Sequence, residues 1–98
     1  MRLRILAPDY KEYGRKILED FRIFAEQEEK FHIAEPNYEG IRINFQDDEV
    51  KGWMLIRMSL HDPILPLNFE ADREGGVDVM AERLRPFLEK EVNLLIYG

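Results

Sequence analysis

Hydrophobic residues recur at steps of three and four residues in two segments of the chain, and this spacing predicts two amphipathic helices. The first extends from about residue 9 to residue 27, and Asp9 with Glu12 has the form of a capping box at its start. Its apolar face carries Tyr10, Tyr13, Ile17, Phe21 and Phe24. The apolar face of the second carries Val77, Met80, Ala81, Leu84, Phe87 and Leu88. Pro86 is expected to kink or shorten this second helix.

Shorter segments alternate between apolar and polar residues, or are almost wholly apolar, and these predict β-strands. Residues 2–6, 41–45 and 64–71 alternate, whereas residues 53–58 are apolar except at Arg57. Residues 31–33 form a short extended piece, and residues 92–97 fit either a final strand or a tail. The main predicted order is strand, helix, three strands and helix.

This order favours an α+β two-layer sandwich, because consecutive strands with short links pair antiparallel and one-sided helices cover a sheet face. We expect a mainly antiparallel four-stranded sheet with two helices packed on one face. Together with the apolar helix faces, four residues are expected to supply most of the core: Trp53, Leu55, Leu67 and Phe69.

Composition narrows the class of protein. The length of 98 residues predicts a single domain over residues 1–98. The formal net charge of −6 disfavours partners with a phosphodiester backbone or an anionic lipid surface. The absence of cysteine excludes disulfides, thiolate metal sites and thiol nucleophiles. We therefore expect a cytoplasmic protein that binds neither nucleic acid nor membrane.

Four features could carry chemistry, and for each we favour a structural interpretation. The acidic residues 47–49 fit a hairpin turn better than a cation site, and His32 fits a packed or surface position better than a metal ligand. Gly75 and Gly76 fit a plain turn better than a phosphate cradle. A set of methionines fits core positions better than a soft-metal site: Met54, Met58 and Met80.

Arg57 is harder to explain structurally, because it interrupts an apolar strand just before a polar loop. A guanidinium at the end of a buried strand is costly unless it pairs with an anion. Arg57 could bind a phosphate together with Ser59, His61 and backbone N–H groups of the loop. It could equally form an internal ion pair with an acid such as Glu70, and spacing alone leaves both interpretations open.

The segment from Gly52 to Pro63, followed by Phe69-Glu70-Ala71, resembles the C-terminal domain of the α-D-phosphohexomutases, the phosphoglucomutase/phosphomannomutase family. That family shows a Gly-Trp strand, an Arg-x-Ser-Asn-Thr-Glu-Pro loop or a close variant, and a strand that ends in Glu-Ala. Residues 38–45, Tyr-Glu-Gly-Ile-Arg-Ile-Asn-Phe, resemble its Asp-Gly-Val/Ile-Arg strand. The resemblance covers about residues 37–88, including the position of the last helix.

The resemblance implies that the loop binds the phosphate of a hexose phosphate such as glucose or mannose phosphate. Arg57 and Ser59 match the family's motif, and Pro63 is retained. Leu60 stands at the Asn or Gly position and can contribute only its backbone N–H, while His61 stands at the Thr position and can donate a hydrogen bond. The implied phosphate-binding set is therefore Arg57, Ser59, Leu60 and His61, with Asp62 in place of the usual Glu or Gln.

The resemblance also indicates what this chain lacks. The family's reaction moves a phosphoryl group between C1 and C6 and uses a phosphoserine loop and an Asp-x-Asp-x-Asp magnesium loop, neither of which is present in these 98 residues. We therefore expect no catalytic residue, metal or cofactor in this chain, with Mg²⁺ and the phosphoserine in preceding domains of a larger enzyme. The alternative hypothesis is a free-standing α+β regulatory or protein-interaction module without catalysis.

Overall fold

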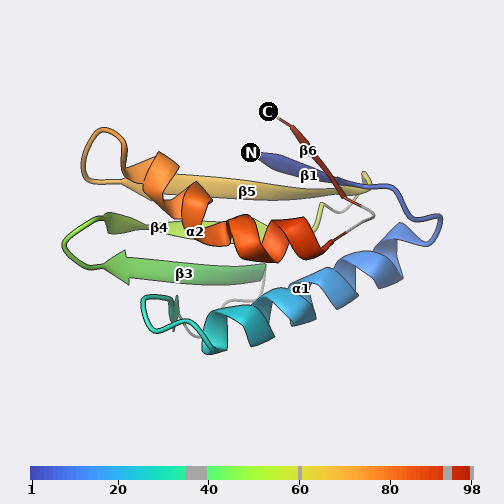
Figure 1. The fold of residues 1–98 in the computed structure, drawn as a ribbon. Helices are drawn as coiled ribbons and strands as arrows, with labels where there is room; N and C mark the ends of the chain where they lie inside the picture. The colour runs from blue at the N-terminus through green and yellow to red at the C-terminus, as the bar shows by residue number, and fades with distance from the viewer. Residues whose placement is uncertain (35–39, 60, 92–93, 98) are drawn as a thin grey trace.

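The computed structural model describes residues 1–34, 40–59, 61–91 and 94–97. Two helices, α1 (Tyr10–Glu26) and α2 (Gly76–Lys90), accompany six strands. The strands are β1 (Arg2–Ile5), β2 (His32–Ala34), β3 (Gly40–Gln46), β4 (Lys51–Arg57), β5 (Ile64–Ala71) and β6 (Leu94–Tyr97). They form one sheet in the order β2-β3-β4-β5-β1-β6, in which every neighbouring pair is antiparallel (Figure 1). The α+β class and the antiparallel pairing are thus confirmed.

The prediction of four strands was wrong, because two short edge strands extend the sheet to six. Residues 32–34 pair with β3, and residues 94–97 pair with β1. The strand β1 lies between β5 and β6, so the N-terminal and C-terminal segments of the chain are neighbours. The pairings of β1 join segments that are distant in sequence, and the alternation within a short strand does not indicate its partner.

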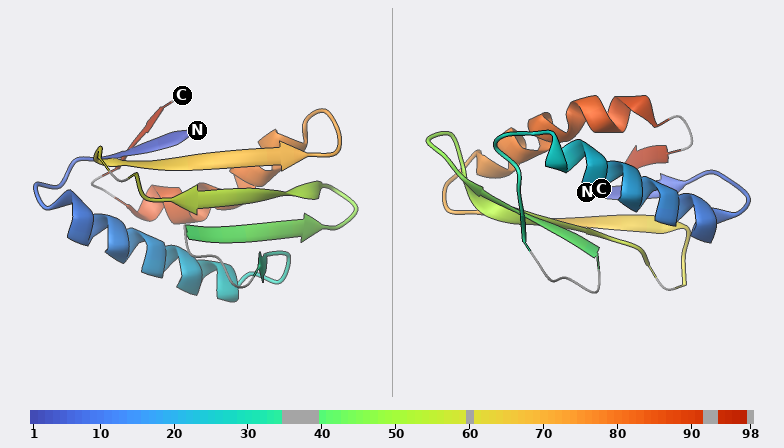
Figure 2. Two further views of the ribbon diagram at one scale, coloured as in Figure 1. Left: turned by 180° about the vertical axis from the view of Figure 1, so that it is seen from behind. Right: turned by 90° about the horizontal axis from the view of Figure 1, so that it is seen from below.

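Both helices lie on the same face of the sheet, as expected, and the opposite face has no helix over it (Figure 2). The start of α1 follows the predicted cap, because the Asp9 side chain accepts a hydrogen bond from the Glu12 backbone N–H at 3.4 Å. The helix α2 continues through Pro86 to Lys90, so Pro86 does not shorten it. No helix in the described part of the chain is long and apolar enough to span a bilayer.

The core lies between the sheet and the helices, and it corrects one prediction about β4. Met54 and Ile56 are the buried residues of this strand, at 0% and 1% exposure. Trp53 and Leu55 are half-buried and lie on the other face of the sheet, so the prediction that they supply the core was wrong. Because β4 carries apolar residues at successive positions, hydrophobicity alone does not say which set points inward. Leu67 is buried as expected, and Phe69 packs against the core from its edge.

Candidate functional site

Arg57 is the last residue of β4 and lies on the sheet face that the helices do not cover. Its side chain is half-buried, and its partner in the neighbouring strand is Gly40. A Cβ atom at residue 40 would meet the Cα and Cβ atoms of Arg57 at 2.9 Å, as well as the backbone oxygen of Ile56. Glycine therefore allows β3 to approach the backbone of Arg57 closely, and β3 places no side chain directly opposite the arginine.

The loop after Arg57 is a compact reversal between β4 and β5. The Ser59 backbone N–H donates to the Ile64 carbonyl at 3.0 Å, and the Ile64 N–H donates to the Asp62 carbonyl at 2.8 Å. The Pro63 carbonyl accepts from Ile5 at 2.7 Å, which ties the loop to β1. The Ser59 N–H is therefore used inside the loop, and Ser59 can contribute only its hydroxyl to a ligand.

The predicted phosphate set is described in part. Ser59 is half-buried and His61 is exposed to solvent, so both side chains are accessible beside the end of β4. Leu60 lies outside the described residues. Strand β4 ends at Arg57, so the strand alternation that would place Ser59 on the same side as Arg57 does not extend to residue 59.

The ion pair from Arg57 to Glu70 is not formed. Glu70 pairs with Trp53 across the sheet, four residues from Arg57 along the strand. At about 3.3 Å per residue the two positions are about 13 Å apart, which is too far for a direct contact. Within the described part of the chain, no acidic group or other hydrogen-bond acceptor is paired with the Arg57 guanidinium. Among the described residues, therefore, no group competes with an external anion for this cation.

The acidic turn between β3 and β4 is structural, as predicted. One Asp47 oxygen accepts hydrogen bonds from the backbone N–H groups of Glu49 and Val50, at 3.0 and 3.3 Å. Arg83 of α2 binds both Asp47 oxygens, at 2.7 and 2.9 Å. These bonds, the one from Arg83 above all, hold the pKa of the Asp47 carboxyl well below its usual range. The described residues contain no cluster of three or more His, Cys, Asp or Glu side chains that could hold a metal ion.

Arg83 is a partner that the sequence analysis missed. Its guanidinium carbon lies 5.5 Å from the centre of the Phe45 ring, and its side chain is only 13% exposed. A basic residue three positions after the buried Met80 falls within the inward stripe of the helix, which was a usable signal. Its partner, however, is 36 residues away in sequence, and no local pattern indicates it.

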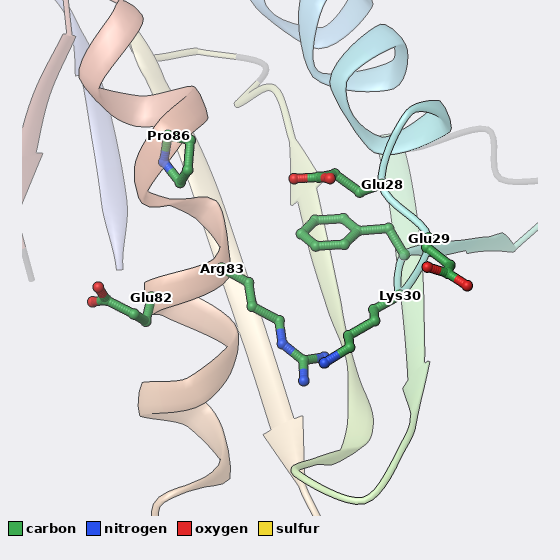
Figure 3. Close-up of a pocket in the computed structure, with 7 residues that line it drawn as sticks. Glu28, Glu29, Lys30, Glu82, Arg83 and Pro86 are labelled. Carbon is green, nitrogen blue, oxygen red and sulfur yellow. The ribbon is translucent and has the colours of Figure 1, made fainter.

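A hollow of about 400 Å³ lies between α2 and the turn that precedes β2, and Figure 3 shows its lining. Arg83 and Lys30 extend toward one another at its opening (Figure 3). Both are already paired with Glu49, at 3.3 and 2.9 Å respectively. The remaining polar lining is acidic: Glu28, Glu29 and Glu82. Because its cations are neutralised from within the chain, the hollow is better explained as part of the brace between α2 and the β3–β4 turn than as an anion site.

The other candidates also have structural explanations. Gly75 has a φ of 84° at the start of α2, a left-handed conformation that favours glycine, and a Cβ at Gly76 would lie 2.5 Å from the Ala71 Cβ. The Gly76 N–H donates to the Arg73 carbonyl at 3.2 Å, so these glycines lie in a turn, as expected. His32 is an exposed surface residue on β2. The three methionines pack in or against the core: Met54, Met58 and Met80.

Comparison with known proteins finds a similarity to part of a longer protein. The chain is 30% identical over 82 residues to a phosphoglucomutase of Neisseria gonorrhoeae. The aligned region is 84% of this chain but 16% of that protein, so the chain spans a small part of its relative. This similarity supports a phosphoglucomutase-related domain. No family model matches the chain, and no solved structure does.

Proposed function

We propose that this chain is the C-terminal phosphosugar-binding domain of a phosphohexomutase-type isomerase, with Arg57 as the main phosphate ligand. The observation that carries the proposal is the half-buried Arg57, which has no acidic partner among the described residues and stands at the mouth of the loop to β5. The similarity to part of a phosphoglucomutase supports the same assignment. The ligand is a hexose phosphate such as glucose or mannose phosphate.

The roles within the proposed site follow from the chemistry of each group. The Arg57 guanidinium offers a planar fork of N–H donors that matches two phosphate oxygens. The Ser59 hydroxyl and the His61 imidazole add hydrogen-bond donors. Leu60 belongs to the proposed set through its backbone N–H alone.

The chain itself is expected to bind rather than catalyse. Phosphoryl transfer between C1 and C6 requires a positioned nucleophile and charge stabilisation, which we assign to a phosphoserine and Mg²⁺ in other domains of the same enzyme. The proposed role of this domain is to hold the sugar phosphate and to close over it. Mutase activity measured for the 98-residue chain alone would contradict this division of labour.

Binding is tested by titrating glucose 6-phosphate into the chain and following backbone amide shifts by NMR. We expect millimolar affinity with shifts centred on residues 57–61, because the remaining contacts belong to other domains. Arg57→Gln should weaken binding at least about tenfold, as loss of a charge-assisted hydrogen-bond pair does. The matched control is Arg85→Gln, since Arg85 is exposed on α2 and pairs with Glu82 and Glu89. Equal binding by wild type and Arg57→Gln would remove Arg57 from the site.

A further inference from the structure

Neither helix nor any other element of the described residues covers the sheet face opposite the helices, and the strand register defines which side chains this face presents (Figure 2). Because Leu3, Met54 and Leu67 point to the helices, their neighbours along each strand point to the open face. We call this surface the open face. Its central residues are Arg42, Asn44, Trp53, Leu55, Arg57, Pro66 and Asn68.

The charge of the open face is opposite to that of the whole chain. Its described strand positions carry five permanent cations and one acid: Arg2, Arg4, Arg42, Lys51 and Arg57 against Glu70. The chain as a whole has 20 acidic and 14 basic residues. Acidic side chains are therefore concentrated elsewhere, and the open face has a local field that favours an anionic partner despite the net charge of −6.

Trp53 and Arg42 form an organised pair at the centre of this face. The Arg42 guanidinium carbon lies 4.6 Å from the centre of the Trp53 ring. Its Nε donates to the Asn44 side-chain oxygen at 3.2 Å, which fixes the orientation of the guanidinium. Stacking and the hydrogen bond reduce the freedom that Arg42 would lose on binding. Tryptophan and arginine are the residues most enriched at the energetic centres of protein interfaces.

The open face is also hollowed, as binding surfaces commonly are. A groove of about 740 Å³ passes over β3 and β4, lined on this side by Arg42, Asn44, Gln46, Lys51 and Trp53. Leu55 and Pro66 are half-buried beside it and supply apolar surface. Apolar and aromatic groups at the centre with cations around them are the arrangement expected for a protein interface.

The charges and aromatic residues of the open face favour one class of binding partner over the others. A second copy of the chain related by a two-fold axis would bring the five cations of each face together, which is repulsive. Sheets that bind single-stranded nucleic acid stack bases on two or three aromatic side chains, whereas Trp53 is the one aromatic residue that β3, β4 and β5 place on the open face. An acidic polypeptide satisfies both the cations and the apolar centre.

We propose that the open face docks an acidic polypeptide segment, with an apolar side chain of that segment on Trp53 and Leu55 and its carboxylates on Arg42 and Lys51. The proposed contacts of the segment do not include Arg57, the residue of this face that the proposed function assigns to phosphate. The inference rests on the register, the Arg42–Trp53 geometry and the charge distribution. It does not require that the chain belong to a phosphosugar enzyme.

The test uses a short synthetic peptide in which glutamates flank a central leucine. Trp53 is the chain's one tryptophan, so its fluorescence reports directly on the proposed centre. We expect a saturable change in emission as the peptide is added. The affinity obtained from this titration should fall several-fold when the salt concentration rises from about 20 mM to about 200 mM. A peptide with lysine in place of glutamate should give no such change.

Variants separate the open face from general electrostatics. Arg42→Gln with Lys51→Gln should weaken peptide binding at least about tenfold, since two charge contacts are lost. The matched control, Arg15→Gln with Arg85→Gln, makes the same change in net charge on exposed helix positions and should leave binding unchanged. Equal weakening by both double variants, or no peptide binding at low salt, would overturn the proposal.

Two further outcomes distinguish this inference from its rivals. Tighter binding of a thymidine oligonucleotide than of the acidic peptide, lost in the Arg42/Lys51 variant, would overturn it in favour of nucleic acid. Titration of glucose 6-phosphate should be unaffected by that variant and affected by Arg57→Gln. Failure of either proposal is therefore visible independently of the other.

Discussion

At the scale of single residues, the best-defined charge interaction joins Arg83 of α2 to Asp47 in the turn between β3 and β4. The two side chains are 13% and 23% exposed and share two hydrogen bonds. Because the pKa of Asp47 is lowered in the folded chain, the carboxylate stabilises the fold above its unfolded pKa of about 3.9. This contribution is lost as the pH falls through the lower folded value.

Replacing Asp47 by asparagine tests this contribution. We expect Asp47→Asn to lower the free energy of unfolding at pH 7 by about 1 kcal/mol, since the pair is partly open to solvent. The difference from wild type should shrink progressively as the pH is lowered below about 5, because the unfolded chain takes up the proton first and the folded carboxylate does so only at its lower pKa. Urea unfolding at a series of pH values measures both effects.

The matched control for Asp47 is Asp20→Asn, which breaks an exposed pair with Lys16 on α1. Its effect at pH 7 should stay below about 0.5 kcal/mol, as is usual for surface ion pairs. If the control variant loses as much stability as Asp47→Asn, the pair of Asp47 with Arg83 contributes no more to the free energy of unfolding than a surface ion pair does.

The same scale shows why one arginine could be singled out from the sequence and the other could not. Arg57 interrupts an apolar run, and a cation in a strand of that kind needs an explanation. Arg83 lies in a helix, where charged residues are ordinary, and its partner is 36 residues distant. Local pattern finds a polar residue in an unusual setting, but it does not find the partner that makes a polar residue structural.

At the scale of elements, two glycines sit where a helix or strand meets its neighbour, and they should differ in their tolerance of a side chain. A Cβ at Gly52 of β4 would meet the backbone of β5, with the Ala71 Cα at 2.9 Å. A Cβ at Gly14 of α1 would meet the Met58 sulfur at 2.5 Å, at the flexible end of a side chain. Backbone cannot yield as a methionine can.

We therefore expect Gly52→Ala to destabilise the fold by about 2 kcal/mol, within the range typical of overpacking. Gly14→Ala should remain within about 1 kcal/mol of wild type, because the gain in helix propensity offsets the movement of Met58. Urea unfolding of both variants gives the comparison. A larger loss for Gly14→Ala than for Gly52→Ala would contradict this assignment of rigid and flexible neighbours.

The elements that were predicted correctly are those in which the hydrophobic residues recur with a clear period. Long stripes such as the one from Tyr10 to Phe24 predicted α1 correctly, because a seventeen-residue helix samples its period several times. In β4 the alternation is masked by Trp53 and Leu55 on one face and Met54 and Ile56 on the other. The short strands β2 and β6 lack the clear alternation of Arg-Leu-Arg-Ile in β1, because β6 reads Leu-Leu-Ile-Tyr and β2 has only three residues.

At the scale of the whole molecule, the net charge of −6 conceals an uneven distribution of charge. The open face presents the arginines of β1, β3 and β4, α1 and α2 each carry equal numbers of acidic and basic residues, and the excess of acidic residues lies in turns and loops such as residues 47–49. The sum over the sequence disfavoured polyanionic partners in general. It said nothing about a single face, because register, which sets the face of each arginine, cannot be obtained from a sum.

The core also behaves as one unit on this scale, because a single cluster of buried residues joins the sheet to both helices. Phe21 is central to it: it is 1% exposed, and its ring centre lies 5.3 Å from that of Phe87 on α2. Phe21→Ala should therefore cost about 3 kcal/mol through lost burial and a residual cavity. Since the cluster is continuous, we expect unfolding to be two-state.

Two probes test this cooperativity from opposite sides of the sheet. Trp53 fluorescence reports on the open face, and far-UV circular dichroism is dominated by α1 and α2. In urea the two transitions should coincide in wild type, and in Phe21→Ala both midpoints should fall by the same amount. A Phe21→Ala variant that loses helical signal before Trp53 responds would mean that the helices can leave the sheet while its strands stay paired. The strands would then hold the open face in place without the helices, so the open face would be stable in its own right.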